Sequence, residues 1–440
     1  MRNDLTDDGL RITSVADSLD VGLELLLQTN ATLFSEQIIS GVGGKGKNWY
    51  NPRMSSLDVD VIIVGGGPAG LSTALHLVQQ DARCGERVWV LEKATYPREK
   101  LCGGGITLPG LALLSGLGLE LDGPHAPVHE VRFRYHDWVY KLESEPAFVV
   151  VHRREFDAWL AVQARSRGVR IREGEAVIAV AVEEDGVRVE TSRGAYRARA
   201  LVAADGSNSV VRRLLKWGKG GKARLLEVLT PGDAASDYFT HGVAEFDWSG
   251  LDAGLQGYAW AFPSLVDGRA MMNLGVFDSR FYPERPRASL LDLLARTLAE
   301  RRLSLADVQL KGYPIHWLQP ATPPARPRVL LAGDAAGVDP LLGEGIAFAL
   351  GYGQAAAAAL AHAFAAGDFR FADYEALVAR HWLLRQLRVR RLGAAILFRS
   401  VHHPWLARAI WRSAPFLFRV LVAILPQHFP LTKQRMTRMA

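Results

Sequence analysis

The stretch from Val59 to Gly70 constrains the fold of this chain more than any other, because it joins a strand, a glycine-rich turn and a helix. Val59 to Val64 is a short apolar run rich in β-branched residues, which is typical of a strand buried on both faces. The turn has the spacing Gly65-x-Gly67-x-x-Gly70, and Pro68 opens a segment with helical periodicity. In such a turn the first glycine permits the bend, the second lets a pyrophosphate approach the backbone, and the third lets the helix pack closely. The stretch therefore predicts a dinucleotide-binding site.

A carboxylate stands where the ribose of such a nucleotide is expected. A second apolar run, Arg87 to Leu91, ends in Glu92, about 20 residues after Gly70. At this position a carboxylate accepts hydrogen bonds from the adenosine ribose. We include the adjacent Lys93 in the predicted nucleotide site.

Length and composition bound the class of protein. A chain of 440 residues predicts two or three domains. Only Cys84 and Cys102 occur, so no disulfide framework exists and a reducing cytoplasm is expected. No apolar stretch reaches the ~18 residues that a membrane span needs, and the N-terminus lacks the basic-then-apolar pattern of a signal peptide.

The positive charge is concentrated at the C-terminal end. The net charge is +6, but residues 376–440 hold 12 Lys and Arg and no acidic residue, which leaves 40 basic against 46 acidic residues elsewhere. Arginines alternate there with Leu, Ile, Phe and Trp, a pattern typical of helices that lie on an anionic membrane surface. We therefore expect a peripheral contact with the inner face of the membrane and, without a base-reading module, no nucleic-acid partner. A helical subdomain with solvated arginines is the alternative interpretation.

Strand patterns later in the chain predict a second sheet. Apolar and polar residues alternate at Tyr238–Phe246, Tyr258–Phe262 and Ala270–Val276, and an alanine-rich helix is expected from Ile346 to about Ala365. The predicted division is a poorly ordered extension at 1–53, a nucleotide-binding domain of 54–112, 147–212 and 325–375, a substrate domain of 113–146 and 213–324, and a helical region at 376–440.

Two further motifs follow predicted strands and give the chain a family resemblance. Asp205-Gly206 follows Ala200–Ala204, and Gly333-Asp334 follows Arg328–Ala332. With the glycine turn, they resemble the flavoprotein fold shared by p-hydroxybenzoate hydroxylase, flavin-dependent halogenases and geranylgeranyl reductases, over about residues 54–375. The resemblance implies an α/β fold, with a Rossmann-type FAD-binding domain, an inserted antiparallel sheet for the substrate and an α-helical C-terminal region.

By this resemblance each motif has a task at the FAD. Arg153 should reach the pyrophosphate, Asp205 should lie near the diphosphate and ribityl chain, and Asp334 should accept a hydrogen bond from a ribityl hydroxyl. The helix that begins near Gly345 should direct its positive end at the flavin ring. No metal ligand is expected. The residues assigned to the cofactor are Gly65, Gly67, Pro68, Ala69, Gly70, Glu92, Lys93, Cys102, Gly103, Arg153, Asp205, Gly206, Gly333, Asp334, Pro340, Gly343, Glu344, Gly345 and Ile346.

Within this superfamily three segments look most like geranylgeranyl reductases: Lys100-x-Cys102-Gly103-Gly104, Gly257-Tyr258-x-Trp260-x-Phe262-Pro263, and the stretch from Asp334 to Ile346. On a strand, Tyr258, Trp260 and Phe262 share one face and suit an apolar, chain-like substrate. The implied reaction reduces C=C bonds of a geranylgeranyl or polyprenyl chain by hydride transfer from reduced flavin N5. Cys102 and Tyr258 are the two candidates for a catalytic role.

No second glycine turn is present for NADPH, so NAD(P)H or another donor, such as ferredoxin or a quinol, is expected to bind transiently. Two other functions stay open. One is an FAD-dependent monooxygenase or halogenase that acts through a flavin C4a-hydroperoxide, although the Trp-x-Trp-x-Ile-Pro run of the halogenases is matched only in part. The other is a non-catalytic, membrane-docked flavin-binding protein.

Overall fold

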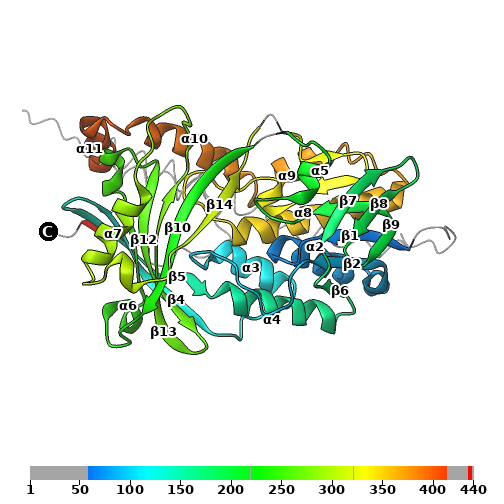
Figure 1. Ribbon diagram of the computed structural model, residues 1–440, viewed down its shortest axis with the longest axis horizontal. Helices are drawn as coiled ribbons and strands as arrows, with labels where there is room; N and C mark the ends of the chain where they lie inside the picture. Colours follow the sequence, from blue (N-terminus) through cyan, green and yellow to red (C-terminus); the bar gives the residue numbers. More distant parts are fainter. Residues whose placement is uncertain (1–57, 219, 321, 414–434, 439–440) are drawn as a thin grey trace, which may run out of the picture.

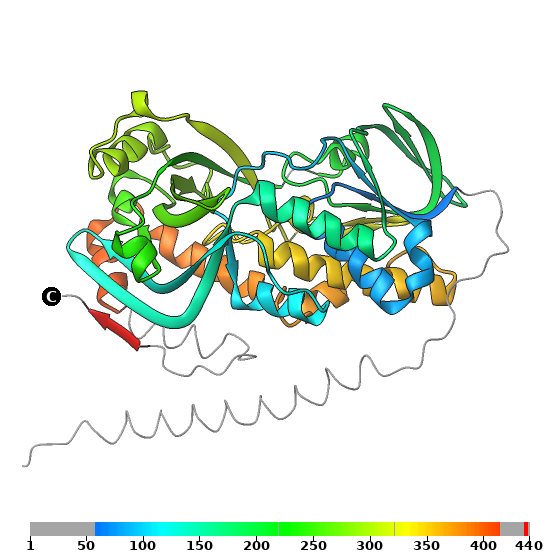
Figure 2. The same ribbon diagram turned by 90° about the horizontal axis from the view of Figure 1, so that it is seen from below.

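The computed structural model describes residues 58–218, 220–320, 322–413 and 435–438, and it has two lobes, each built on a β-sheet (Figures 1 and 2). The predicted extension 1–53 and, within the basic C-terminal region, residues 414–434 and 439–440 lie outside the described residues. The predicted α/β architecture, with an inserted antiparallel sheet and C-terminal helices, is confirmed.

The first sheet carries the glycine turn. Its strand order is β15-β16-β9-β1-β2-β6, and β1 (Val59–Val64) lies at its centre between the parallel strands β9 and β2. Every residue of β1 is buried, as its uninterrupted apolar pattern predicts. The other strands of this sheet are β2 (Val88–Glu92), β6 (Arg170–Glu173), β7 (Val177–Val182), β8 (Val187–Thr191), β9 (Gly194–Ala203), β15 (Ala325–Arg326) and β16 (Val329–Leu331).

Two buried helices pack against each other in this lobe. Helix α2 (Pro68–Gln80) follows the glycine turn, and α8 (Ile346–Ala366) crosses it so closely that a Cβ on Gly353 would lie 2.4 Å from Ser72 Oγ. Among the described helices, α8 alone is long and apolar enough to cross a membrane, but 78% of that window is buried inside the protein. The expectation that no apolar stretch reaches a spanning length was therefore wrong, and α8 is a core helix.

The second sheet is mostly antiparallel, in the order β14-β10-β13-β12-β11-β4-β5-β17, and β3 pairs with β5. Helix α7 (Leu290–Ala299) packs on one face through Leu290, Leu294 and Leu298, while the other face carries a cluster of aromatic residues. The strands are β3 (Gly105–Thr107), β4 (His125–Tyr135), β5 (Trp138–Val151), β10 (Gly221–Pro231), β11 (Val243–Asp247), β12 (Gly257–Val266), β13 (Arg269–Asp278), β14 (Lys311–Trp317) and β17 (Arg435–Arg438).

The remaining helices surround the two sheets. Helices α10 and α11 run along the second lobe, whereas α9 packs against α8 in the first lobe (Figure 1). The helices not yet bounded are α3 (Leu108–Gly116), α4 (Arg153–Ser166), α5 (Val210–Leu214), α6 (Asp237–Thr240), α9 (Tyr374–Arg380), α10 (Gln386–Arg399) and α11 (Pro404–Arg412).

Two sequence predictions fail locally. The expected strand Tyr238–Phe246 is instead the helix α6 followed by β11, because Gly242, at a φ of +62°, turns the chain between them. The C-terminal region is also not helical throughout, since β17 pairs with the free edge of β5. The proposed domain division stays a prediction, and β5 runs across its boundary at residue 147 as one continuous strand.

Candidate active site

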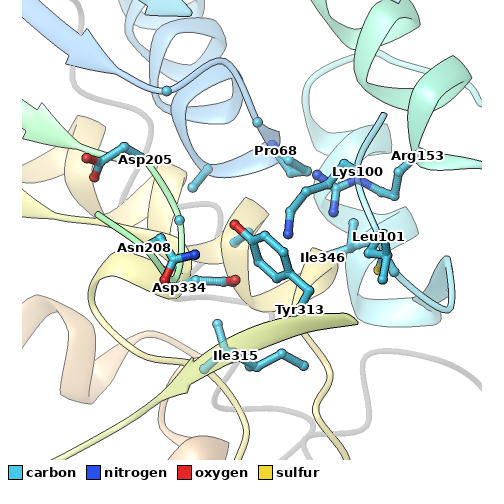
Figure 3. Close-up of a pocket in the computed structure, with 18 of the residues that line it drawn as sticks. Pro68, Lys100, Leu101, Arg153, Asp205, Asn208, Tyr313, Ile315, Asp334 and Ile346 are labelled. Atoms are coloured by element: carbon cyan, nitrogen blue, oxygen red, sulfur yellow. The ribbon is translucent and has the colours of Figure 1, made fainter. Parts of the chain in front are cut away.

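A cavity of about 730 Å³ lies where the two sheets meet. The glycine turn, the loop 98–105, the segments that follow β9 and β16, and the start of α8 contribute to its wall (Figure 3). The aromatic face of β12 forms another part of the wall. Segments far apart in the sequence thus converge on one site. The sequence-predicted residues that line it are Gly65, Gly67, Pro68, Ala69, Glu92, Lys93, Cys102, Gly103, Arg153, Asp205, Gly206, Tyr258, Trp260, Phe262, Asp334, Gly343, Glu344, Gly345 and Ile346.

The three glycines of the turn differ in their surroundings. Gly65 has a φ of +104°, and a Cβ there would lie 2.4 Å from Ala204 O. A Cβ on Gly70 would lie 2.0 Å from Gly65 O, so the helix approaches the turn only because this residue has no side chain. At Gly67 a Cβ would meet nothing nearer than the guanidinium groups of Arg98 and Arg153, at 3.8 and 3.9 Å. Gly67 therefore opens the backbone at the start of α2 toward the cavity.

Two arginines, each paired with a carboxylate, lie at this end of the cavity. Arg153 donates to both carboxylate oxygens of Asp157, at 2.7 and 2.8 Å, and Arg98 lies 3.1 Å from Asp157 and 3.2 Å from Glu92. Glu92 also accepts the backbone N–H of Gly66 at 3.0 Å. Two guanidinium groups, already paired with Asp157 and Glu92, and the N-terminus of α2 thus adjoin one exposed backbone segment, and their N–H groups are of the kind that bind a pyrophosphate.

Two aspartates stand farther along the cavity. Asp334 Oδ2 accepts a hydrogen bond from Ser207 Oγ at 2.7 Å, and Asp205 Oδ2 accepts the N–H of Val211 at 3.1 Å. Asp205 Oδ1 is buried without a hydrogen-bond partner, and burial raises the pKa of this carboxyl, against the hydrogen bonds that favour its charged form. Buried polar atoms are normally partnered, so this oxygen calls for a donor from a ligand.

The loop before α8 is fixed by buried charges. Arg390 of α10 donates to Asp339 at 2.6 Å and lies 2.7 Å from Glu344, and Thr107 donates to the other oxygen of Glu344. Glu344 therefore lines the cavity with its charge already paired. Helix α8 begins at Ile346, with Gly345 as its N-cap residue, so its positive end faces the cavity.

The far wall of the cavity is aromatic. Tyr258, Trp260 and Phe262 share one face of β12, as predicted, and Phe148, Phe246 and Phe277 extend it. Ring centroids of neighbouring pairs lie 5.0 to 5.6 Å apart for Phe246–Phe262, Phe148–Phe262 and Tyr258–Phe277. This wall offers an extended apolar surface.

The two predicted catalytic candidates differ in their surroundings. The Tyr258 hydroxyl donates to Leu342 O, and burial raises its pKa, so its proton is held. The geometry therefore favours Tyr258 as part of the wall. Cys102 lies on the cavity surface, and its carbonyl is held by Asn273 Nδ2 at 3.2 Å.

Three assigned residues do not reach the cavity. Gly70, Gly333 and Pro340 lie behind its wall; Gly333, at a φ of +61°, brings its backbone against Ala69. The structure also places Arg98, Asn208 and Tyr313 on the wall, and none of them was predicted. Lys100 lines the wall too, and it had no predicted role although it stands in the Lys100-x-Cys102-Gly103-Gly104 motif. Lys100 and Asn208 could have been suspected because they lie in or next to a motif. Arg98 and Tyr313 had no such signal.

Comparisons with known proteins agree with this geometry. The family described as FAD binding domain matches residues 58–381. The chain belongs to this family and is an FAD-dependent oxidoreductase. Menaquinone reductase of Mycobacterium tuberculosis is 31% identical over 68% of this chain and 75% of its own length. Digeranylgeranylglycerophospholipid reductase 1 of Methanothermobacter thermautotrophicus is 28% identical over 73% of this chain and 82% of its own length.

Solved structures of this flavoprotein superfamily share the fold. A geranylgeranyl bacteriochlorophyll reductase-like protein of Thermoplasma acidophilum superposes with a TM-score of 0.64 at 22% identity, over 82% of this chain and 98% of that one. A flavin-dependent brominase also gives a TM-score of 0.64, at 18% identity, over 84% of this chain and 96% of its own. The predicted resemblance to geranylgeranyl reductases within the p-hydroxybenzoate hydroxylase-like superfamily is confirmed.

The residues of this flavoprotein fit FAD. The open backbone at Gly67 beside two guanidinium groups suits a pyrophosphate, and the unpartnered oxygen of Asp205 suits a hydroxyl donor. Among the residues that the structure describes, no group of three His, Cys, Asp or Glu side chains is arranged to hold a metal ion.

Proposed function

We propose that this flavoprotein reduces isolated C=C bonds of an isoprenoid chain. The observation that carries the proposal is the aromatic wall of Tyr258, Trp260 and Phe262 in the same cavity as the glycine turn, because a chain without polar groups needs an extended apolar surface. The names of two relatives, a digeranylgeranylglycerophospholipid reductase and a menaquinone reductase, support a lipid substrate that bears such chains.

One set of residues would bind FAD, and another would align the isoprenoid chain with it. Gly67, Arg98, Arg153, Asp205 and Asp334 would hold FAD, which in its reduced form supplies a hydride. The aromatic wall would hold the chain close to the reactive ring and exclude water, since an unactivated alkene offers no carbonyl for the protein to polarise. Cys102 remains a proposed residue on the substrate side. The electrons would come from NAD(P)H or another donor that binds transiently.

Anaerobic turnover tests the proposal. The FAD-loaded protein, reduced with dithionite, is mixed with a phospholipid that carries geranylgeranyl chains or with a prenylated quinone, and the lipid is examined by mass spectrometry. We expect a gain of two hydrogens per reduced bond together with reoxidation of the flavin. A reduced flavin that no such lipid reoxidises would refute the proposal.

A monooxygenase or halogenase is the second candidate, because the brominase has the same fold. The two candidates differ in how the reduced protein treats oxygen. Substrate-triggered consumption of NAD(P)H with oxygen or halogen appearing in the product would favour this second function. If FAD bound but no pair of donor and substrate cycled it, the chain would be a flavin-binding protein without turnover.

We also propose that the protein meets its lipid substrate at the inner face of the membrane, through an exposed surface of α10 and α11. Leu392 and Ile396 of α10 are 62% and 56% exposed, and Trp405 of α11 is 70% exposed. Exposed arginines flank them at positions 388, 399, 408 and 412. Apolar side chains among cations, in a region without acidic residues, suit an anionic lipid surface.

The double variant Leu392→Asp/Ile396→Asp tests this contact. We expect its partition onto phosphatidylcholine vesicles that contain phosphatidylglycerol to fall at least roughly tenfold, since a buried apolar side chain contributes about 1.5–3 kcal/mol. Co-sedimentation measures the bound fraction. The control is Val162→Asp on α4, which replaces an apolar residue of similar exposure, 57%, and should bind as the wild type does. Equal binding of the double variant would refute the contact.

A further inference from the structure

We propose that Lys100 delivers the proton that alkene reduction requires, and that Glu227 returns a proton to Lys100 after each turnover. The inference rests on the proposed function, because it concerns the proton partner of the hydride. The two residues are buried titratable groups, one on the loop 98–105 and one on the second sheet. Neither has been assigned to the FAD site or to the aromatic wall.

Lys100 lines the same cavity as the aromatic wall. It lines the cavity from the loop 98–105, and its Nζ lies 3.3 Å from the centre of the Tyr313 ring, which holds the ammonium over the cavity (Figure 3). Burial and, less strongly, Arg153 lower the pKa of Lys100 to about 8, against Asp334, Cys102 and Asp157, which favour the charged form. An ammonium with this pKa both carries and releases a proton near neutral pH.

Glu227 stands on β10 beneath the same loop. It shares a face of the strand with Leu225, which lines the cavity, and its Oε2 is buried without a hydrogen-bond partner. Burial raises the pKa of Glu227 to about 7, while Asn273, Lys100, Lys311 and the backbone of Cys102 favour its carboxylate. Lysine and carboxyl are therefore brought to similar proton affinities by burial, and exchange of a proton between them costs little free energy.

Lys311 connects this pair to solvent. It is the direct partner of Glu227 across the β10–β14 ladder, and its side chain is 41% exposed beside Glu99, at 3.5 Å. Titratable groups thus follow one another from the surface to the cavity, in the order Lys311, Glu227, Lys100. An enclosed apolar site needs such a succession, since the aromatic wall keeps bulk water away from the reacting bond.

The proposed step adds one hydride and one proton to the alkene. The π bond of the alkene breaks and two C–H bonds form: one from the hydride of reduced FAD, which brings both electrons, and one from the proton of the Lys100 ammonium. The cofactor is oxidised and the alkene is reduced. Neutral Lys100 then takes a proton from Glu227, which regains one from solvent past Lys311.

Lys100→Arg is the sharpest test, because arginine keeps the positive charge and does not release its proton in proteins. With the dithionite-reduced holoenzyme and a geranylgeranyl phospholipid, we expect flavin reoxidation to slow at least tenfold while FAD content stays that of the wild type. Glu227→Gln should slow multiple turnovers and move the fall in rate that we expect for the wild type above about pH 7 toward about pH 8, where Lys100 loses its proton. Glu143→Gln, an exposed carboxylate on the same sheet, is the matched control.

Infrared titration of the substrate-free holoenzyme gives a readout independent of turnover. We expect the wild type to show a protonated carboxyl band that disappears as the pH rises through about 7, and Glu227→Gln to lack that band. Wild-type rates in Lys100→Arg, or a carboxyl band absent below about pH 7, would each overturn the proposal. If the wild type itself reduced no lipid alkene, the proposed function would fail instead, and the inference with it.

Discussion

Replacing Arg390 with methionine is expected to destabilise this flavoprotein by about 3–5 kcal/mol and to release its FAD. The guanidinium lies 2.6 Å from Asp339 and 2.7 Å from Glu344, and its side chain is only 13% exposed. Without it two buried carboxylates face each other with no cation. The loop that holds them lines the cavity and leads into α8, so the loss of stability and the loss of cofactor should occur together.

Urea unfolding and flavin absorbance of the purified protein measure the two effects. Arg388→Met, at an exposed position of the same helix, should change both by little. Adding Asp339→Asn and Glu344→Gln to Arg390→Met removes the uncompensated charges and should recover part of the stability. If Arg390→Met were as stable and as yellow as the wild type, the ion pairs would not organise this loop.

The sequence predicted the parts of the site that depend on local spacing. A strand followed by Gly65-x-Gly67-x-x-Gly70 could be assigned to a nucleotide-binding turn from its spacing alone. The structure shows why glycine is required there, because a Cβ on the first or third glycine would collide with a backbone oxygen. The Asp205-Gly206 and Gly333-Asp334 motifs were found for the same reason, since each ends a buried strand of one parallel sheet. The period-two pattern of Tyr258, Trp260 and Phe262 likewise determined which face they share.

Contacts between segments far apart in the chain could not be predicted in this way. Arg390 was one of many arginines in a basic tail, and nothing in its neighbourhood indicated a partner 51 residues earlier. The burial of Glu227 could not be predicted either, because it stands in an ordinary strand pattern and a carboxylate in a strand normally faces solvent. Its Oε2 is nevertheless buried, and only tertiary structure brings the loop that carries Lys100 and Cys102 close to it.

The errors in secondary structure have the same origin. Tyr238 to Phe246 alternates like a strand, but Gly242 divides it, and the Ser236 carbonyl accepts the N–H groups of Phe239 and Thr240 as a helix begins. The last described segment, Arg435–Arg438, forms a strand because it pairs with the free edge of β5. Four residues are too few to show a strand pattern in the sequence, so this pairing could not be predicted.

Gly67→Val is expected to give a folded protein that binds FAD at least tenfold more weakly, a loss of about 1.4 kcal/mol or more. At a φ of −89° and ψ of −175° the backbone accepts a β-branched residue. A Cβ there meets nothing nearer than 3.8 Å, so the apoprotein should unfold at the urea concentration of the wild type. The added methyl groups occupy the cavity beside Arg98 and Arg153, where the pyrophosphate is proposed to lie.

Gly70→Val is the matched comparison, because the same side chain is added three residues away with the opposite consequence. Its Cβ would lie 2.0 Å from Gly65 O, so the turn and α2 must move apart and the apoprotein itself should lose stability. Titration of each apoprotein with FAD, together with urea unfolding, separates the two effects. Wild-type affinity in Gly67→Val would mean that the phosphates lie elsewhere, whereas equal destabilisation by both substitutions would mean that Gly67 serves the fold and not the ligand.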